Sequence, residues 1–126
     1  MVIGVGTDIV SNQRIAQLFA KQGLRFAQRI LSVAELEQFA QHHAPERLLA
    51  KRWALKESVA KALGTGFSQG VSFTDMSVGY HDSGQPYLQL QGKTLAIAQA
   101  KGINDWQISI SDEQDYSIAF AMAQSI

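Results

Sequence analysis

The chain has 126 residues, 46% of them hydrophobic, with 11 basic and 11 acidic side chains and no cysteine. This length and hydrophobic content suit a single globular domain over residues 1–126. The absence of cysteine excludes disulfides, thiolate metal ligands and a cysteine nucleophile. No apolar run approaches the about 20 residues that cross a bilayer, and no signal-peptide pattern opens the chain. We therefore expect a cytoplasmic protein without a membrane partner.

The first predicted element is a strand over residues 2–10, an apolar and β-branched segment whose composition indicates burial. Asp8 lies inside this segment, between Thr7 and Ile9. A carboxylate in a buried strand must be hydrogen-bonded, paired with a cation or bound to a metal, because an isolated buried charge is too costly. The alternative is that Asp8 caps the helix that follows.

The next segment, residues 12–22, is predicted to form an amphipathic helix, and the region around it is basic. Between residues 11 and 34 there are four basic side chains and no acidic one: Arg14, Lys21, Arg25 and Arg29. The charge of the whole chain is uneven, with nine Lys and Arg against five Asp and Glu in residues 1–66, and two against six in residues 67–126. The basic cluster favours a polyanionic partner or a phosphate-rich ligand, with a solvated face as the alternative. Nucleic acid is not expected, because the cluster lacks interleaved aromatics and the chain is not basic overall.

The remaining elements are predicted from apolar periodicity and end signals. A short helix begins at the capping-box pair Ser32 and Glu35 and ends near His42 or His43. There follow, in order, a long helix from Pro45 to Leu63, strands 76–81 and 86–91, a helix over 93–101, and strands 106–111 and 116–123. This order indicates an α+β fold, with helices packed against a mainly antiparallel sheet.

The long helix carries two charged residues on one face, just before a glycine-rich turn. Glu57 and Lys61 stand at i and i+4, about one turn apart, on a face other than the apolar one formed by Leu55, Val59, Ala62 and Leu63. Gly64 and Gly66 then allow a sharp turn and the close approach of a ligand. A carboxylate, an ammonium and backbone amides suit a metal-bound phosphate, and Asp8 with Glu57 would give Mg²⁺ the oxygen ligands it prefers. The alternative is a surface ion pair followed by a glycine cap.

At these residues the sequence resembles the holo-acyl-carrier-protein synthases, the small class of 4′-phosphopantetheinyl transferases. The matching motifs occur in the family's order and are Gly6 to Val10, Arg25 to Ser32 with Glu35, Leu49 to Glu57, Lys61 to Gly66, and Gly84 to Pro86. The resemblance implies transfer of the 4′-phosphopantetheine arm of coenzyme A to a serine of an apo acyl carrier protein, in support of fatty acid biosynthesis. Adenosine 3′,5′-bisphosphate would be the second product.

The resemblance also implies roles for individual residues. Asp8 and Glu57 would hold Mg²⁺, for which Mn²⁺ can substitute, and Lys61 would stabilise the pyrophosphate. Glu57 or a metal-bound water would deprotonate the serine, and both alternatives stay open. The residues expected to bind coenzyme A are Lys51, Arg52, Lys61, Gly64, Thr65, Gly66, Gly84 and Pro86.

The resemblance finally implies two kinds of protein partner. Acyl carrier proteins are acidic, which gives Arg14, Lys21, Arg25 and Arg29 a specific target. A chain of this size should form a homo-oligomer, a trimer in the family, in which the Gly84–Pro86 hairpin and the 109–112 strand end complete a neighbour's site. Many relatives have histidine where Asp112 stands, so a nucleotide contact at Asp112 is in doubt.

Two rival functions are a non-catalytic module that binds coenzyme A and an adaptor that docks an acidic protein.

Overall fold

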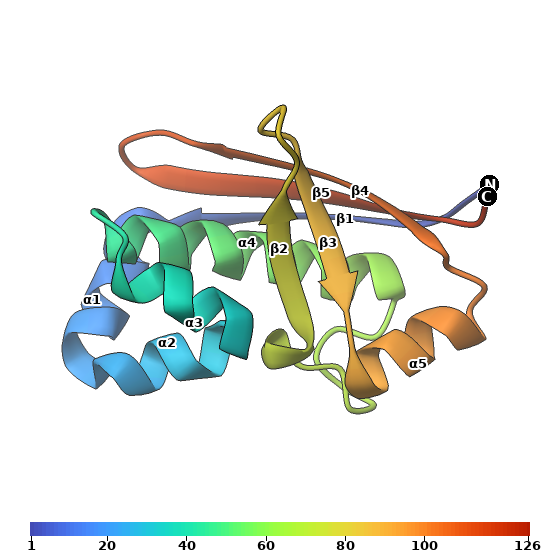
Figure 1. The fold of residues 1–126 in the computed structure, drawn as a ribbon, viewed down its shortest axis with the longest axis horizontal. Coiled ribbons are helices and arrows are strands. Elements are labelled where there is room, and N and C mark those ends of the chain that lie inside the picture. Colours follow the sequence, from blue (N-terminus) through green and yellow to red (C-terminus); the bar gives the residue numbers. More distant parts are fainter.

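A computed structural model gives the fold of residues 1–126 (Figure 1). The elements are, in order, β1 (Val2–Ser11), α1 (Asn12–Gln22), α2 (Leu24–Ile30), α3 (Val33–Ala40), α4 (Pro45–Leu63), the 3₁₀ helix η1 (Phe73–Asp75), β2 (Met76–Tyr80), β3 (Pro86–Leu90), α5 (Gly92–Ala100), β4 (Asp105–Asp112) and β5 (Tyr116–Gln124). The predicted α+β class is confirmed. Each predicted helix and strand is present, with ends close to those expected. The helix that the sequence patterns do not predict is α2, which Gly23 separates from α1 at a positive φ of 64°.

The strands form two antiparallel sheets, one with the order β1-β5-β4 and one made of β2 and β3. In the first sheet Asp8 of β1 lies opposite Ala119 of β5. The long helix α4 runs along this sheet, while α1, α2 and α3 gather at one end of the molecule and α5 lies at the other (Figure 1). The β2–β3 pair crosses α4, and its turn projects beyond the larger sheet (Figure 1).

Two glycines let α4 lie directly against β1. A Cβ added to Gly4 would stand 2.0 Å from the carbonyl oxygen of Ala62, and one added to Gly6 would stand 1.9 Å from the carbonyl oxygen of Ser58. No side chain fits at either position, because real Cβ atoms essentially never approach another heavy atom within 3.0 Å. The close contact brings the backbone of β1, with Asp8, next to the C-terminal half of α4.

The hydrophobic core is built around α4. The predicted apolar face is confirmed, since Leu55, Val59, Ala62 and Leu63 are all buried. Before these residues in the helix, the indole of Trp53 lies with its ring centroid 6.0 Å from that of Phe26 in α2 and 5.2 Å from that of Phe73 in η1. At 19 residues α4 is the longest helix, and no helix combines the length and the apolar character needed to cross a membrane.

The prediction that the first strand is buried is wrong for one of its faces. Val5 and Ile9 are 56% and 61% exposed, because α4 covers only the opposite side of the sheet. Ile9 lies opposite Ile118 of β5, and Phe120 lies opposite Thr7; both β5 side chains are also exposed. We call the uncovered apolar side of the β1-β5-β4 sheet the outer sheet face, formed by Val5, Ile9, Tyr116, Ile118 and Phe120.

Candidate active site

Asp8 and Lys61 meet where β1 crosses the end of α4. The ammonium of Lys61 lies 3.2 Å from Oδ1 of Asp8 and donates a hydrogen bond of 2.9 Å to the carbonyl oxygen of Thr7. The Asp8 side chain is 16% exposed and that of Lys61 is 52% exposed. The aspartate is therefore anchored at the edge of the protein interior, whereas the lysine can still turn one of its donors toward a ligand.

The Glu57 carboxyl belongs to the same group of charges. Its pKa is raised, first by partial burial and then by the negative charge of Asp8, while Lys61 and Arg14 act in the opposite direction. The structure thus brings together Asp8, Glu57 and Lys61, and it adds Arg14 from α1. We call Asp8, Glu57 and Lys61 the β1–α4 cluster.

The donor set of the β1–α4 cluster fits a magnesium ion. A cation between two carboxylates offsets the repulsion between their negative charges. Carboxylate oxygens are also the hard ligands that Mg²⁺ prefers. Lys61 occupies only Oδ1 of Asp8. No three or more His, Cys, Asp or Glu side chains lie close enough together to hold a metal ion by themselves. Asp8 and Glu57 could supply two ligands, and phosphate oxygens and water would then fill the other positions of an octahedral ion, as is usual for Mg²⁺ with phosphate substrates.

The glycine turn after α4 differs from its predicted role. Gly64 adopts a left-handed conformation with φ 80°, and its N–H donates to the carbonyl oxygen of Lys61 at 3.0 Å. The N–H of Gly66 donates to the carbonyl oxygen of Ala60 at 3.2 Å, and the Thr65 hydroxyl donates to the carbonyl oxygen of Gly66. The Gly64 and Gly66 amides are engaged in capping the helix. These two amides are already paired within the chain, and a phosphate contact at this turn stays a prediction.

A groove of about 730 Å³ opens beside α4 at the end of the helix away from its glycine turn. Its lining residues come from the start of α1, the segment before α4, α4 itself and the β4–β5 turn, and include Asn12, His42, His43, Arg47, Lys51 and Asp112. Lys51, which is predicted to bind coenzyme A, lines this groove. The sequence patterns do not identify His42, His43 and Arg47 as groove residues, because the three become neighbours of the β4–β5 turn only in the folded chain.

Charges in this groove are partly paired. Arg47 and Asp112 form an ion pair of 2.8 Å, so the negative charge of Asp112 is offset by a cation. The His42 and His43 rings stack with centroids 4.7 Å apart. The pKa of His42 is lowered, first by burial and then by the positive charges of His43 and Lys51. Nδ1 of His42 accepts a hydrogen bond from the Ala44 amide.

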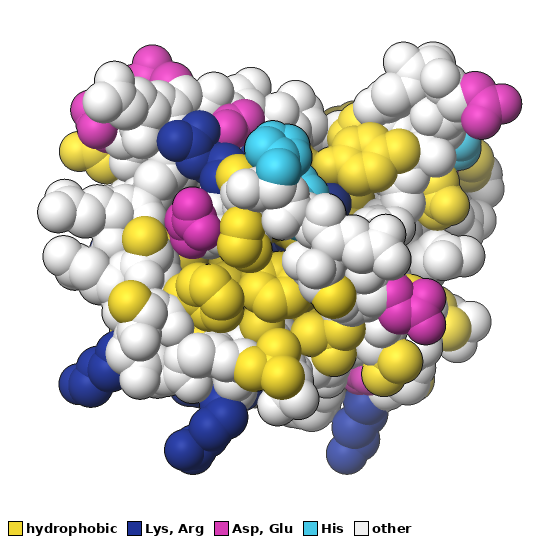
Figure 2. All heavy atoms as spheres, turned by 60° about the vertical axis from the view of Figure 1, so that its left-hand side comes forward, with side chains coloured by type: hydrophobic (Ala, Val, Ile, Leu, Met, Phe, Trp, Pro, Cys, Tyr) yellow, Lys and Arg dark blue, Asp and Glu magenta, His cyan; other side chains and the backbone are white.

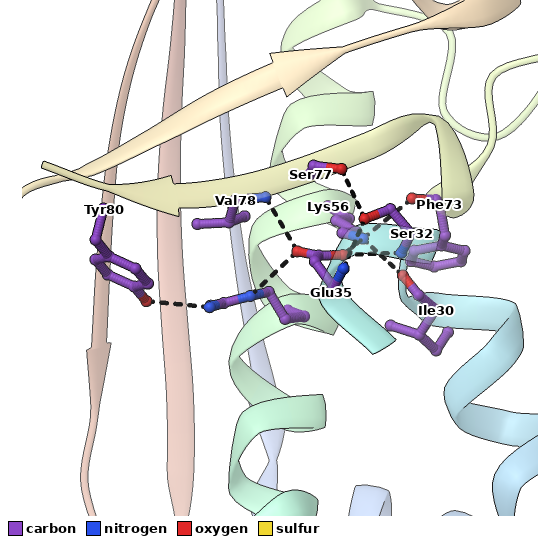
Figure 3. A network of polar contacts seen from close by, with 9 residues as sticks. Ile30, Ser32, Glu35, Lys56, Phe73, Ser77, Val78 and Tyr80 are labelled. Atoms are coloured by element: carbon purple, nitrogen blue, oxygen red, sulfur yellow. Dashed lines mark hydrogen bonds and ion pairs between the residues drawn. The ribbon is translucent and has the colours of Figure 1, made fainter. Parts of the chain in front are cut away.

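Arg52 does not join the groove, although it follows Lys51 in sequence. Its side chain is 2% exposed, its Nε lies 3.3 Å from Oε2 of Glu35, and its Nη2 donates to the hydroxyl of Tyr80 at 3.2 Å (Figure 3). A guanidinium held in the interior in this way does not reach a ligand in the groove. The prediction that Arg52 binds the nucleotide phosphates is therefore not supported, because successive helical residues point about 100° apart.

The Gly84–Pro86 turn lies away from the β1–α4 cluster within one chain. Gly84 is exposed at the tip of the β2–β3 turn with φ 91°. Pro86 lines a hollow of about 280 Å³ together with Trp106 and Gln107 of β4. This arrangement places the turn next to β4, which forms the opposite edge of the sheet from β1.

The predicted basic cluster lies on the surface of α1 and α2. Arg14, Lys21, Arg25 and Arg29 are all exposed, and Nη1 of Arg29 donates to Oε1 of Gln22 at 3.4 Å. On the end of the molecule formed by α1, α2 and α3, Lys and Arg side chains project along the lower edge, below a patch of apolar side chains (Figure 2). Arg14 lies nearest to the β1–α4 cluster, because its charge acts on Glu57.

Known proteins resemble this chain over nearly its whole length. The model of the 4′-phosphopantetheinyl transferase superfamily matches residues 4–121. A holo-[acyl-carrier-protein] synthase of Hydrogenovibrio crunogenus is 58% identical over 125 residues, which cover 99% of this chain and 98% of that protein. The crystal structure of the holo-[acyl-carrier-protein] synthase from Neisseria meningitidis is 42% identical with a TM-score of 0.94, covering 99% of this chain and 100% of that one. A Bacillus anthracis holo-(acyl-carrier-protein) synthase in complex with CoA (3′,5′-ADP) is 29% identical with a TM-score of 0.82, covering 100% and 99%.

Proposed function

Because the chain belongs to the 4′-phosphopantetheinyl transferase superfamily, we infer that it transfers the 4′-phosphopantetheine group of coenzyme A to a serine of apo acyl carrier protein. The reaction yields holo acyl carrier protein and adenosine 3′,5′-bisphosphate. The observation that carries this inference is the β1–α4 cluster, two carboxylates and an ammonium whose chemistry suits a cation and a phosphate, in a chain whose relatives along its whole length are holo-[acyl-carrier-protein] synthases.

One incubation tests this function against its two rivals. The purified chain is mixed with coenzyme A, Mg²⁺ and an apo carrier, and the mass of the carrier is measured. A gain of one phosphopantetheine arm identifies the transferase. Binding of coenzyme A without modification of the carrier would indicate a non-catalytic module. Carrier binding that does not respond to coenzyme A would indicate an adaptor.

For the reaction itself, we propose that the carrier serine attacks the β-phosphorus of the coenzyme A pyrophosphate, and the bond to the adenosine 3′,5′-bisphosphate breaks. Asp8 and Glu57 are the proposed ligands of Mg²⁺, or of Mn²⁺ in its place, and a bound ion would neutralise charge on the pyrophosphate. Lys61 donates to the phosphate oxygens as negative charge accumulates on the leaving group. Either the Glu57 carboxylate or a metal-bound water would accept the serine proton.

The groove lined by Lys51 is the proposed site for the nucleotide part of coenzyme A. Its volume of about 730 Å³ lies within the range of small-molecule sites. Lys51, Arg47 and the two histidines supply donors for phosphate, and the pairing of Arg47 with Asp112 reduces repulsion by the aspartate. Arg52 plays no direct part in binding, because it is buried against Glu35.

The outer sheet face supports the proposal of a homo-oligomer. Exposed apolar patches of this kind mark protein interfaces, and burial of Ile9, Ile118 and Phe120 against another copy would remove them from water. The family resemblance implies a trimer. In such a trimer the turn at Gly84 and Pro86, which lies away from the β1–α4 cluster of its own chain, would complete a neighbour's site.

The basic side chains of α1 and α2 are the proposed docking surface for the acidic carrier protein. Arg14 links this surface to the reaction centre, because its charge acts directly on Glu57. Lys21, Arg25 and Arg29 continue the surface along the two helices. A carrier held by these exposed charges would associate faster at low salt than at high salt.

A further inference from the structure

Glu35, Lys56 and Arg52 form a buried ionic network that includes no residue of the groove or of the proposed reaction centre (Figure 3). Its centre is the Glu35 carboxylate of α3, which is 3% exposed. Oε1 accepts from the Ser32 amide at 3.0 Å and from the Lys56 ammonium at 2.5 Å. Oε2 accepts from the Val78 amide at 3.0 Å and lies 3.3 Å from Nε of Arg52. One carboxylate thus binds α3, α4 and β2 together.

Lys56 extends the network to two further segments. Besides Glu35, its ammonium donates to the carbonyl oxygen of Ile30 at the end of α2, at 2.7 Å, and to that of Phe73 in η1, at 3.1 Å. All three of its donors are satisfied although the side chain is fully buried. At the N-terminus of α3, the hydroxyl of Ser77 in β2 donates to that of Ser32, the N-cap residue, at 2.6 Å. These bonds leave α4 little freedom to rotate about its axis.

The network and the reaction centre occupy two different faces of the same helix. Arg52 and Lys56 stand at i and i+4, as do Glu57 and Lys61, and the second pair lies five residues after the first, which is about 140° around the axis. Any rotation that moves one pair moves the other by the same angle. At a side-chain radius of about 5–6 Å, a rotation of about 20° displaces a head group by about 2 Å. A displacement of only about 1 Å can cost about 100-fold in rate.

The composition of the network is not what stability alone would select. Two cations face one anion, and Nη1 of Arg52 is buried without a hydrogen-bond partner. Apolar side chains of similar volume commonly stabilise a core as well as or better than buried ions do. Charged and bidentate groups differ from apolar ones in fixing a single geometry, because their hydrogen bonds are directional.

We propose that Glu35 is a positioning residue for the transfer reaction: through Lys56 and Arg52 it fixes the rotation of α4 that turns Glu57 and Lys61 toward Asp8. The same carboxylate holds the Val78 amide of β2, so it also sets where the β2–β3 turn lies relative to α4. This inference rests on the proposed function, because Glu57 and Lys61 matter only if the β1–α4 cluster performs the transfer.

The test compares Glu35→Gln with Phe39→Leu. Phe39 is buried on the same helix α3 and packs against Phe19, with ring centroids 5.6 Å apart, outside the network. Both changes should lower thermal stability, but only Glu35→Gln should alter the site. We expect kcat per folded molecule to fall about tenfold or more, with a smaller change in the KM for coenzyme A, because most of the groove is lined by segments outside α4. Mn²⁺ binding in the presence of coenzyme A, followed by electron paramagnetic resonance, should weaken in parallel.

Glu35→Gln leaves two buried cations unpaired, so a second variant removes one of them. In Glu35→Gln/Lys56→Met the excess charge is lower, and the double variant should fold and regain stability over Glu35→Gln. Its kcat and Mn²⁺ affinity should nevertheless stay low, because α4 has lost the bonds that fix its rotation. Recovery of kcat together with stability would show a purely structural role and overturn the proposal, as would a double variant that does not fold.

The outcomes separate this inference from the proposed function. A wild-type chain that transfers no phosphopantetheine would refute the function, whatever the variants do. A wild-type chain that transfers it, with Glu35→Gln matching Phe39→Leu in kcat and Mn²⁺ affinity, would refute the positioning role alone. A loss confined to Glu35→Gln and the double variant would support it.

Discussion

Substitution of Gly6 by alanine should separate α4 from β1 and thereby open the β1–α4 cluster. The new Cβ would stand 1.9 Å from the carbonyl oxygen of Ser58 and 2.9 Å from the amide nitrogen of Ala62, both backbone atoms that no rotamer change can move. An ordinary contact needs about 3.4 Å, so the helix must retreat by roughly 1.5 Å at this point. The 3.2 Å contact between Lys61 and Asp8 would then exceed hydrogen-bonding distance.

We expect two consequences of Gly6→Ala. Overpacking should destabilise the fold by about 1–3 kcal/mol or somewhat more, since both partners are backbone. Turnover per folded molecule should fall about 100-fold, as expected for a misplacement of about 1 Å or more. Val59→Ala is the control, because it removes two buried methyl groups from the same helix at a cost of about 2 kcal/mol without pushing the helix away from the strand.

The assay measures the initial rate of phosphopantetheine transfer at a temperature where circular dichroism shows both variants to be folded. Val59→Ala should keep a rate close to that of the wild type. If Gly6→Ala does the same, or if the two variants lose activity in equal measure, then close contact between β1 and α4 does not set the geometry of the site.

Three further predictions concern metal, phosphate and carrier. Excess chelator should abolish transfer, and Mg²⁺ or Mn²⁺ should restore it; full activity in chelator would exclude Asp8 and Glu57 as ligands of a required ion. Lys61→Ala should lower kcat strongly, because the interaction of the ammonium with the leaving phosphate grows as charge accumulates there. Lys61→Arg should not restore kcat, since a guanidinium differs in shape from an ammonium. A near-normal rate for Lys61→Ala would show that Lys61 only forms a surface ion pair. Arg14→Glu should raise the KM for the carrier far more than the KM for coenzyme A, and added salt should have the same effect. Lys51→Glu should instead raise the KM for coenzyme A more than that for the carrier. If each variant changes both KM values equally, the docking surface and the groove are not distinct.

Helix boundaries could be predicted from the sequence because the residues that set them act locally. Pro45 at the first turn and Gly64 after the last define α4. The capping box of Ser32 and Glu35 is present as predicted at the start of α3. The same reasoning does not reveal that the Glu35 carboxylate also receives Lys56 and Arg52, because these donors come from a distant segment of the chain.

In the candidate site, too, local features could be predicted from the sequence and tertiary contacts could not. The spacing of Glu57 and Lys61 predicts a shared helical face, but only the tertiary contact at Gly4 and Gly6 brings Asp8 to it. The sequence does contain a signal for this contact: Gly4 and Gly6 stand at alternate positions of the strand, so one face of the strand has no side chains there and another element can approach closely. Lys51 and Arg52 look equivalent in sequence, yet one lines the groove and the other is buried. The position of Arg52, one turn before Lys56 and so on the same face of the helix, is the signal that distinguishes them.

The outer sheet face also lay beyond local reasoning. The segment from Val2 to Val10 is apolar on both sides of the strand, which is typical of a fully buried strand. In the folded chain only one side is covered, and Val5 and Ile9 remain exposed. The local pattern of a single strand does not show whether its second apolar side is covered within the chain or, as proposed for this protein, by another copy.

The most direct test of the β1–α4 cluster is the intact mass of an apo carrier after incubation with coenzyme A, Mg²⁺ and one of three proteins: the wild-type chain, Asp8→Asn or Glu57→Gln. We predict that the wild type adds one phosphopantetheine arm, whereas the two folded variants leave the carrier unmodified over the same time. An unmodified carrier with the wild type, or an arm added at the wild-type rate by both variants, would contradict the assignment of the reaction to Asp8 and Glu57.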